Sequence, residues 1–353
     1  MHKTRLAMVT AAIVSALTLG ALTSCAADKT STQAPAEGEA TSAEGADLQA
    51  KADDATDGST KADDATAQET PTKDKGATVE KTSQTTAAKG NAALANQLRA
   101  DVTAIAESSG MDMGISIIDL TDGTRAGYRA AQPMVSASMI KLIVAHTFLK
   151  QVEAGTFSLD ATYTLKGSDL VGGAGVIAGY GAGAQISYRD ILMRMIDNSD
   201  NTAANILIDA VGMDAINADA TKIGLTGTKI NRRMMDTEAI AAGVENYVSA
   251  DDIARLLQMV HKGTFVGPKS SALMLKALEQ QEDWGGIRNG LPEGMVFAHK
   301  TGDLSNAHHD GGIAEGDHPV IIVVLCSGSG FWEGGANQAM AQVASAVTTD
   351  CNL

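Results

Sequence analysis

Three short polar clusters stand in order along the second half of this 353-residue chain, and their residue types suit nucleophilic acyl transfer. They are Ser138-Met139-Ile140-Lys141, Ser199-Asp200-Asn201 and Lys300-Thr301-Gly302. A serine hydroxyl becomes a nucleophile when a base takes its proton, and a lysine in a partly dry pocket can be that base. Each cluster alone is a weak signal. Together they place two serines, two lysines and an asparagine on separate elements, as serine acyl transfer requires.

The first cluster supplies the expected nucleophile and base. Ser138 is expected at or near the start of an apolar helix, where unpaired N–H groups and the helix dipole favour a developing anion. Lys141 follows one turn later on the same face and can reach the serine oxygen. The alternative is a helix-capping serine beside a solvated lysine. Burial of Lys141 in so apolar a segment would, however, be costly without a partner or a purpose.

The other two clusters are expected to complete the site. Ser199 could relay a proton to the leaving nitrogen, and Asn201 could hydrogen-bond a substrate amide or the first lysine. The alternative for this cluster is a simple helix N-cap, for which all three residue types are suited.

The last cluster ends a predicted strand. Lys300 and Thr301 offer a charge and a hydroxyl to a substrate carboxylate, and Gly302 allows close approach to the backbone. The N–H of Asp303 could pair with that of Ser138 as an oxyanion hole. An exposed strand end and turn is the alternative.

The pattern of apolar residues predicts an α+β fold over residues 91–353. Strands are expected near both ends, with helices between them. The terminal strands should share one sheet, and the middle should form a helical lobe. The predicted helices are 91–108, 138–152, 187–196, 202–211, 249–260 and 335–349, and the predicted strands are 113–120, 124–129, 295–301, 311–314 and 320–325.

Residues 1–24 are typical of an export signal, with a basic start and an apolar stretch. The signal ends before Cys25 in a sequence that resembles the bacterial lipoprotein box, so we expect lipidation at this cysteine and a location on the outer side of a cytoplasmic membrane. An ordinary secretory signal or an uncleaved anchor are the alternatives. Residues 25–90 are a low-complexity segment with a short tandem repeat and are expected to be a disordered linker.

The formal net charge is −15, of which −11 falls on residues 91–353. So acidic a domain argues against nucleic acid or an anionic membrane surface as a partner. We expect a monomer that needs no cofactor and no metal. Export would permit a disulfide between Cys326 and Cys351, but the predicted final helix would hold them about 20 Å apart, beyond disulfide reach.

The three clusters are together the signature of class A β-lactamases and penicillin-binding serine hydrolases, which the chain resembles over roughly residues 91–350. The sequence around the clusters, at residues 195–207 and 290–302, is also similar to that of the family. The resemblance implies a β-lactamase or DD-peptidase-like fold with an antiparallel sheet. It implies Ser138 as nucleophile, Lys141 and Ser199 in proton transfer, and Lys300 and Thr301 in binding a substrate carboxylate.

The chain departs from the family in two places. The hydrolases of the family carry a glutamate in an E-x-x-L-N motif, about 36 residues after the serine of the second cluster, that activates the deacylating water. Here that region has no such motif, and Asp236 is the nearest carboxylate, with Glu238 second. His308 stands near the place of an arginine that helps to hold the substrate carboxylate, which it could do only when protonated.

Three functions stay open on the sequence. The first is a β-lactamase that opens the lactam with Ser138 and releases the product with water. The second is a DD-peptidase-like enzyme that acts on D-Ala-D-Ala peptides of the cell wall and needs no such glutamate. The third is a tethered binding protein or sensor that captures β-lactams or wall peptides without turnover.

Overall fold

The computed structural model describes residues 90–283 and 285–353. The expected export signal, Cys25 and the linker lie outside these residues, so the predictions that rest on them stay predictions. Within the described residues, no helix has the length and apolar character needed to cross a bilayer.

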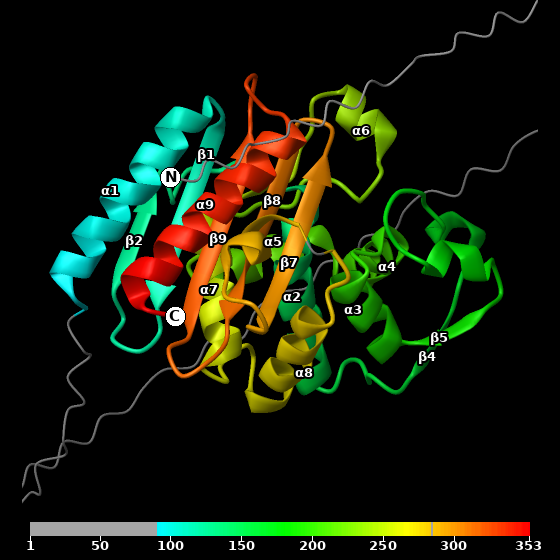
Figure 1. Ribbon diagram of the computed structural model, residues 1–353. Coiled ribbons are helices and arrows are strands. Elements are labelled where there is room, and N and C mark those ends of the chain that lie inside the picture. Colours follow the sequence, from blue (N-terminus) through cyan, green and yellow to red (C-terminus); the bar gives the residue numbers. More distant parts are fainter. Residues whose placement is uncertain (1–89, 284) are drawn as a thin grey trace, which may run out of the picture. The chain divides into compact units, whose positions relative to one another are not determined.

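A five-stranded antiparallel sheet joins the two ends of the described chain (Figure 1). β1 pairs with β9 from Asp112 opposite Ser327 to Asp119 opposite Val320. The predicted α+β class, with N- and C-terminal strands in one sheet, is confirmed. In spatial order the strands are β2 (Arg125–Tyr128), β1 (Asp112–Asp119), β9 (Val320–Ser327), β8 (Ala307–Ala314) and β7 (Phe297–Leu304).

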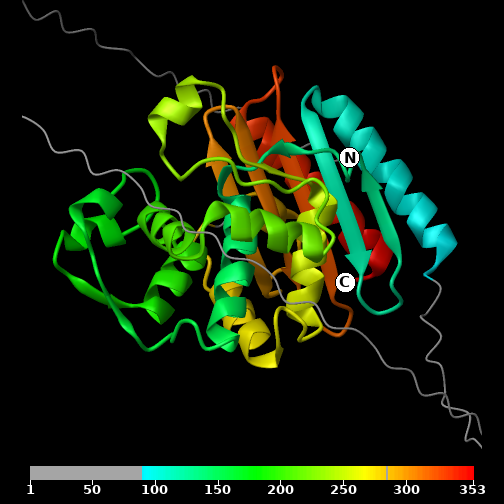
Figure 2. The same cartoon turned by 180° about the vertical axis from the view of Figure 1, so that it is seen from behind.

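Helices cover both faces of the sheet, which is why β9 is a continuous apolar run with almost every residue buried. α1 (Ala92–Ser109) and α9 (Glu333–Cys351) pack together over the face seen in Figure 1. Figure 2 shows the other face, which is covered by green and yellow helices from the middle of the chain, among them α7 (Ala250–His261).

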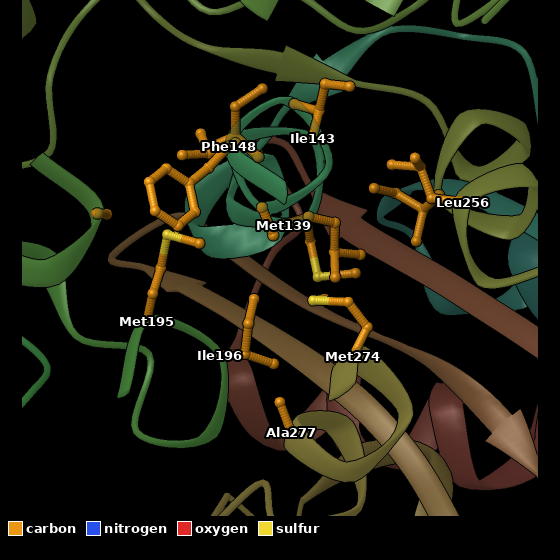
Figure 3. Packing of buried hydrophobic residues seen from close by; sticks show 14 of the residues in the cluster. Met139, Ile143, Phe148, Met195, Ile196, Leu256, Met274 and Ala277 are labelled. Atoms are coloured by element: carbon orange, nitrogen blue, oxygen red, sulfur yellow. The ribbon is translucent and has the colours of Figure 1, made fainter. Parts of the chain in front are cut away.

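α2 (Lys141–Glu153) is the central helix of this middle part and carries the lysine of the first cluster. Its first nine residues are all buried. Apolar side chains surround it, so the core fixes where its first turn lies. Figure 3 shows Ile143 and Phe148 of this helix with Leu256 of α7, Met195 and Ile196 of α3 (Tyr188–Asp197), and Met274 of α8 (Pro268–Glu279).

A buried carboxylate ties α2 to α5 (Met213–Lys222). The Asp219 carboxylate lies 2.7 Å from His146 Nδ1, accepts a hydrogen bond from Thr147 Oγ1 at 3.1 Å and pairs with Lys150. Burial opposes its ionisation, but the hydrogen bonds from His146 and Lys150 outweigh burial and lower the pKa of Asp219 to about 2. These contacts fix the rotation and the position of α2 relative to α5.

The sequence did not predict the shortest elements, because two to five residues show no clear periodicity. Two small antiparallel pairs form, and short helical turns lie in the connections. They are β3 (Met134–Val135) with β6 (Tyr247–Val248), β4 (Thr162–Thr164) with β5 (Gln185–Ser187), α6 (Thr237–Ala241), η1 (Ala137–Ile140), η2 (Gly167–Asp169), η3 (Ile177–Tyr180) and η4 (Gly286–Gly290).

Cys326 in β9 and Cys351 at the end of α9 are both free and buried. They form no disulfide with each other. Burial raises the pKa of each thiol to about 12.

Candidate active site

Ser138 lies in the 3₁₀ turn η1 directly before α2, rather than in the α-helix that the sequence predicted. Ala137, before it, has a left-handed backbone with φ 43°, which bends the chain into the turn. Strand β7 passes very close at Gly302, where a Cβ atom would lie 3.1 Å from Ser138 N. A side chain at this position would require a shift of a few tenths of an ångström, so glycine favours the close approach of the third cluster to the backbone of the first.

Lys141 is fully buried and contacts the nucleophile directly. Its Nζ lies 2.8 Å from Ser138 Oγ, 2.9 Å from Asn201 Oδ1 and 3.2 Å from Ser199 Oγ. Burial, and then the charge of Lys300, hold the pKa of Lys141 well below its ordinary value. The structure thus places the Lys141 ammonium group within hydrogen-bond distance of the Ser138 hydroxyl. This group loses its proton more readily than that of an ordinary lysine.

The second cluster forms the corner between α3 and α4 (Asn201–Val211). Ser199 has a left-handed backbone with φ 54°, which turns its side chain and its carbonyl toward Lys141. Asp200 caps α4 by accepting from Ala203 N, and its other oxygen accepts from the backbone of Val176 and Ile177. The carboxylate therefore fixes both the corner and the loop opposite it.

Lys300 of β7 reaches the same corner. Its Nζ donates to Ser199 Oγ at 3.0 Å and to Thr301 O at 2.7 Å. Burial lowers the pKa of Lys300 to about 8, against the opposing charges of Asp303 and Asp283. The Ser199 hydroxyl therefore lies between Nζ of Lys141 and Nζ of Lys300. It is placed to pass a proton across the site.

These residues open into one cavity of about 590 Å³. The structure brings the three clusters together around it, as the sequence analysis required. Ser138, Ser199, Asn201, Thr301 and Asp303 line it directly.

Asp236 does not reach this cavity. It is the N-cap of α6 and accepts a hydrogen bond from Ala239 N at 3.0 Å. Glu238 is exposed on the same helix. The structure therefore shows Asp236 as the cap of α6, and its predicted water-activating role stays a prediction.

Met235 occupies the position 36 residues after Ser199, and its side chain lines the cavity with Met234 and Ile240. This wall is apolar. Counting along the sequence from Ser199 could have identified Met235, but its residue type gave no reason to select it.

His308 of β8 also differs from its predicted place. It is buried outside the cavity, with Nδ1 paired to Asp303 and Nε2 3.0 Å from Asn337 Oδ1. Burial lowers its pKa, but the hydrogen bond and charge of Asp303 outweigh burial and raise it. His308 is therefore paired with Asp303, a residue of the cavity lining, and its predicted role at a substrate carboxylate stays a prediction.

Three further lining residues were not found from the sequence. Arg232 is held by Glu245 at 2.6 Å, and Glu282 and Asp283 lie on the connection between α8 and η4. They carry no motif, and only the fold brings them to the site.

A family model described as the beta-lactamase enzyme family matches residues 94–350. The chain belongs to this family. A β-lactamase from Citrobacter koseri is 27% identical over 209 residues, which cover 58% of this chain and 71% of that protein. The β-lactamase CTX-M-8 of Citrobacter amalonaticus is 28% identical over 238 residues, 65% of this chain and 81% of the relative.

The solved structures agree. A β-lactamase from Sphaerobacter thermophilus DSM 20745 aligns with a TM-score of 0.66 and 26% identity, covering 73% of this chain and 98% of that one. The structure of PBP-A has the same fold at a TM-score of 0.66 and 23% identity, covering 72% and 95%. The protein is thus a serine hydrolase of the β-lactamase type.

Because burial depresses the pKa of Lys300 to about 8, the folded state should resist its protonation. The unfolded chain binds a proton at Lys300 up to about pH 10, so folding gains stability as pH rises from about 8 to 10. Measured by urea unfolding, the stability of the wild type relative to Lys300→Met should rise by about 2–3 kcal/mol over this range. The exposed Lys262→Met controls for loss of one lysine, and a constant difference for Lys300→Met would contradict the assignment.

Proposed function

We propose that this enzyme opens the amide of β-lactams by forming an ester between Ser138 Oγ and the lactam carbonyl carbon. The contact of 2.8 Å between Lys141 Nζ and Ser138 Oγ carries the proposal, together with the depressed pKa of that lysine. A neutral amine at this distance can take the hydroxyl proton as the oxygen attacks.

The remaining groups serve the later part of the acylation step. The backbone N–H groups of Ser138 and Asp303 stabilise the oxyanion of the tetrahedral intermediate, and loss of one such donor typically costs about 3 kcal/mol. As the C–N bond breaks, the leaving nitrogen takes a proton from the Ser199 hydroxyl. Lys141, which holds the proton taken from Ser138, then returns a proton to Ser199. Lys300 and Thr301 bind the substrate carboxylate, and Asn201 binds the side-chain amide.

Release of the acyl group needs an activated water. The apolar residues of the cavity wall bear on this step. Met234, Met235 and Ile240 line the cavity, and Met235 stands 36 residues after Ser199, the spacing at which the family carries its glutamate. This observation favours a second candidate, an enzyme that acylates readily but deacylates slowly, as a penicillin-binding or DD-peptidase-like protein acting on wall peptides does.

One experiment separates these functions. The full-length protein is mixed with a fluorescent penicillin, and both the retained label and the hydrolysis of a chromogenic cephalosporin are followed. We expect rapid labelling, none in Ser138→Ala, and a label that persists longer than in an efficient β-lactamase. Release of D-Ala from a wall pentapeptide would favour the peptidase, and a stable label alone would favour a sensor. Absence of label in the wild type would contradict all three.

Met235→Glu should speed deacylation, because it returns a carboxylate to the wall that faces the ester. A general base contributes about 10²- to 10⁴-fold in an optimised site, so at least a tenfold shorter label lifetime is expected. Ile240→Glu places the same group elsewhere on this wall, and Asp236→Asn retains a capping oxygen; neither should change the lifetime. An unchanged lifetime in Met235→Glu would show that something other than the missing carboxylate limits release.

We also propose that the protein is exported and held at the outer side of a cytoplasmic membrane by a lipid on Cys25, acting as a monomer. The support is the signal-like residues 1–24 and the lipoprotein-like sequence that ends in this cysteine. In a bacterial host, Cys25→Ser should move the protein from the membrane fraction to the soluble exported fraction. Retention of the variant in the membrane would contradict lipid anchoring.

A further inference from the structure

The acidic residues of the catalytic cavity have no place in the acylation chemistry. Of the described residues that line it, three are acidic: Glu282, Asp283 and Asp303. Asp303 is paired with His308. Asp283 accepts a hydrogen bond from Gly285 N at 3.3 Å, and among residues 90–283 and 285–353 no ion pair engages either Asp283 or Glu282.

The cations near this edge are already engaged. The Arg232 guanidinium bonds Glu245 at 2.6 Å, and Lys300 is fully buried and donates to Ser199 and Thr301. His308, which the sequence predicted at the substrate carboxylate, is held outside the cavity. Apart from Lys300, which binds the substrate carboxylate, a ligand beside Glu282 and Asp283 therefore meets two carboxylates that no described cation pairs with.

A further acidic residue, Asp197, is buried beside these carboxylates. Asp197 is 5% exposed; one of its carboxylate oxygens has no hydrogen-bond partner among the described residues, and the other pairs with Arg194 at 3.3 Å. It lies next to Glu282, whose N–H donates to the Asp197 carbonyl at 3.2 Å. Asp303, Asp283 and Asp197 all act on the charge of Lys300. These carboxylates thus lie near the buried ammonium group of Lys300 in β7.

Other residues of the cavity lining are apolar. Val176, Met235 and Ile240 line the same cavity and are 43%, 43% and 39% exposed. Exposed apolar side chains that gather at a cavity mark a surface for apolar groups of a ligand. The cavity therefore has one apolar wall and one acidic edge.

We propose that Glu282 and Asp283 select substrates that carry a cationic amine near the scissile amide, together with an apolar group. This inference rests on the proposed function, because it concerns which acyl donors reach Ser138. An amine offsets the repulsion that a substrate carboxylate meets at this edge, and exposed charge pairs of this kind are worth about 0.5–1 kcal/mol. The preference should be largest at low ionic strength, where screening is weak.

The test compares ampicillin with penicillin G, which differ by one side-chain amine, at a pH where that amine is protonated. The second-order rate constant for acylation of Ser138 is measured with the full-length protein at low and high salt. We expect ampicillin to react about twofold to fivefold faster at low salt, and the ratio to fall at high salt. In the double variant Glu282→Gln, Asp283→Asn the ratio should fall to about one.

Glu279→Gln is the matched control. This exposed glutamate stands three residues before Glu282 and does not line the cavity, so its removal should leave the ratio as in the wild type. Thermal melting shows whether the double variant folds, and in a folded variant the salt dependence of the ratio should also vanish. Acylation by both drugs with a ratio near one, or with a ratio that the double variant keeps, would overturn this inference alone. Failure of both drugs to acylate would overturn it together with the proposed function.

Discussion

The site depends on a lysine ammonium that has been removed from water and set against a serine hydroxyl. Lys141 is fully buried, and its Nζ has only oxygen atoms of the serine and asparagine clusters around it. Burial of a charged amine without a carboxylate partner is costly, and the group responds by releasing its proton more easily. The same penalty that works against stability makes this residue a base. Lys300, buried nearby, increases the effect through its charge.

The free-energy cost of burying Lys141 is tolerated because packing on every side fixes the first turn of α2. The helix is enclosed by apolar side chains, and Asp219 anchors it to α5. Two residues with left-handed backbones, Ala137 and Ser199, bend the chain so that hydroxyl groups face the lysine. Such strained positions persist only where the surrounding structure determines them. Gly302 then lets β7 close the site from the third side.

Much of this could be predicted from the sequence, because it rests on local patterns. The long helices α1, α7 and α9 and the central strand β9 have clear periodicity or continuous apolar runs, and they begin within two residues of the predicted bounds. The three clusters were recognisable because their residue types are chemically unusual in combination.

The rest depends on partners that are distant in sequence. His308 has a suitable residue type and a suitable place in the chain, but Asn337 and Asp303 hold both of its ring nitrogens. Asp236 has the right charge, but the start of α6 uses it as a cap. The residues that line the wall and the edge of the cavity, such as Met235 and Glu282, carry no motif at all. Residue type alone does not say which contact a polar group will make.

The central claim is that Lys141 gives up its proton far more easily than an ordinary lysine, and it can be measured directly. In protein labelled with ¹³C at the lysine Cε atoms, the resonance assigned by Lys141→Arg can be followed over a pH titration. The account predicts that this lysine titrates well below the ordinary value near 10.4. Titration in the ordinary range would mean that Lys141 stays charged at neutral pH, and would contradict its role as the base.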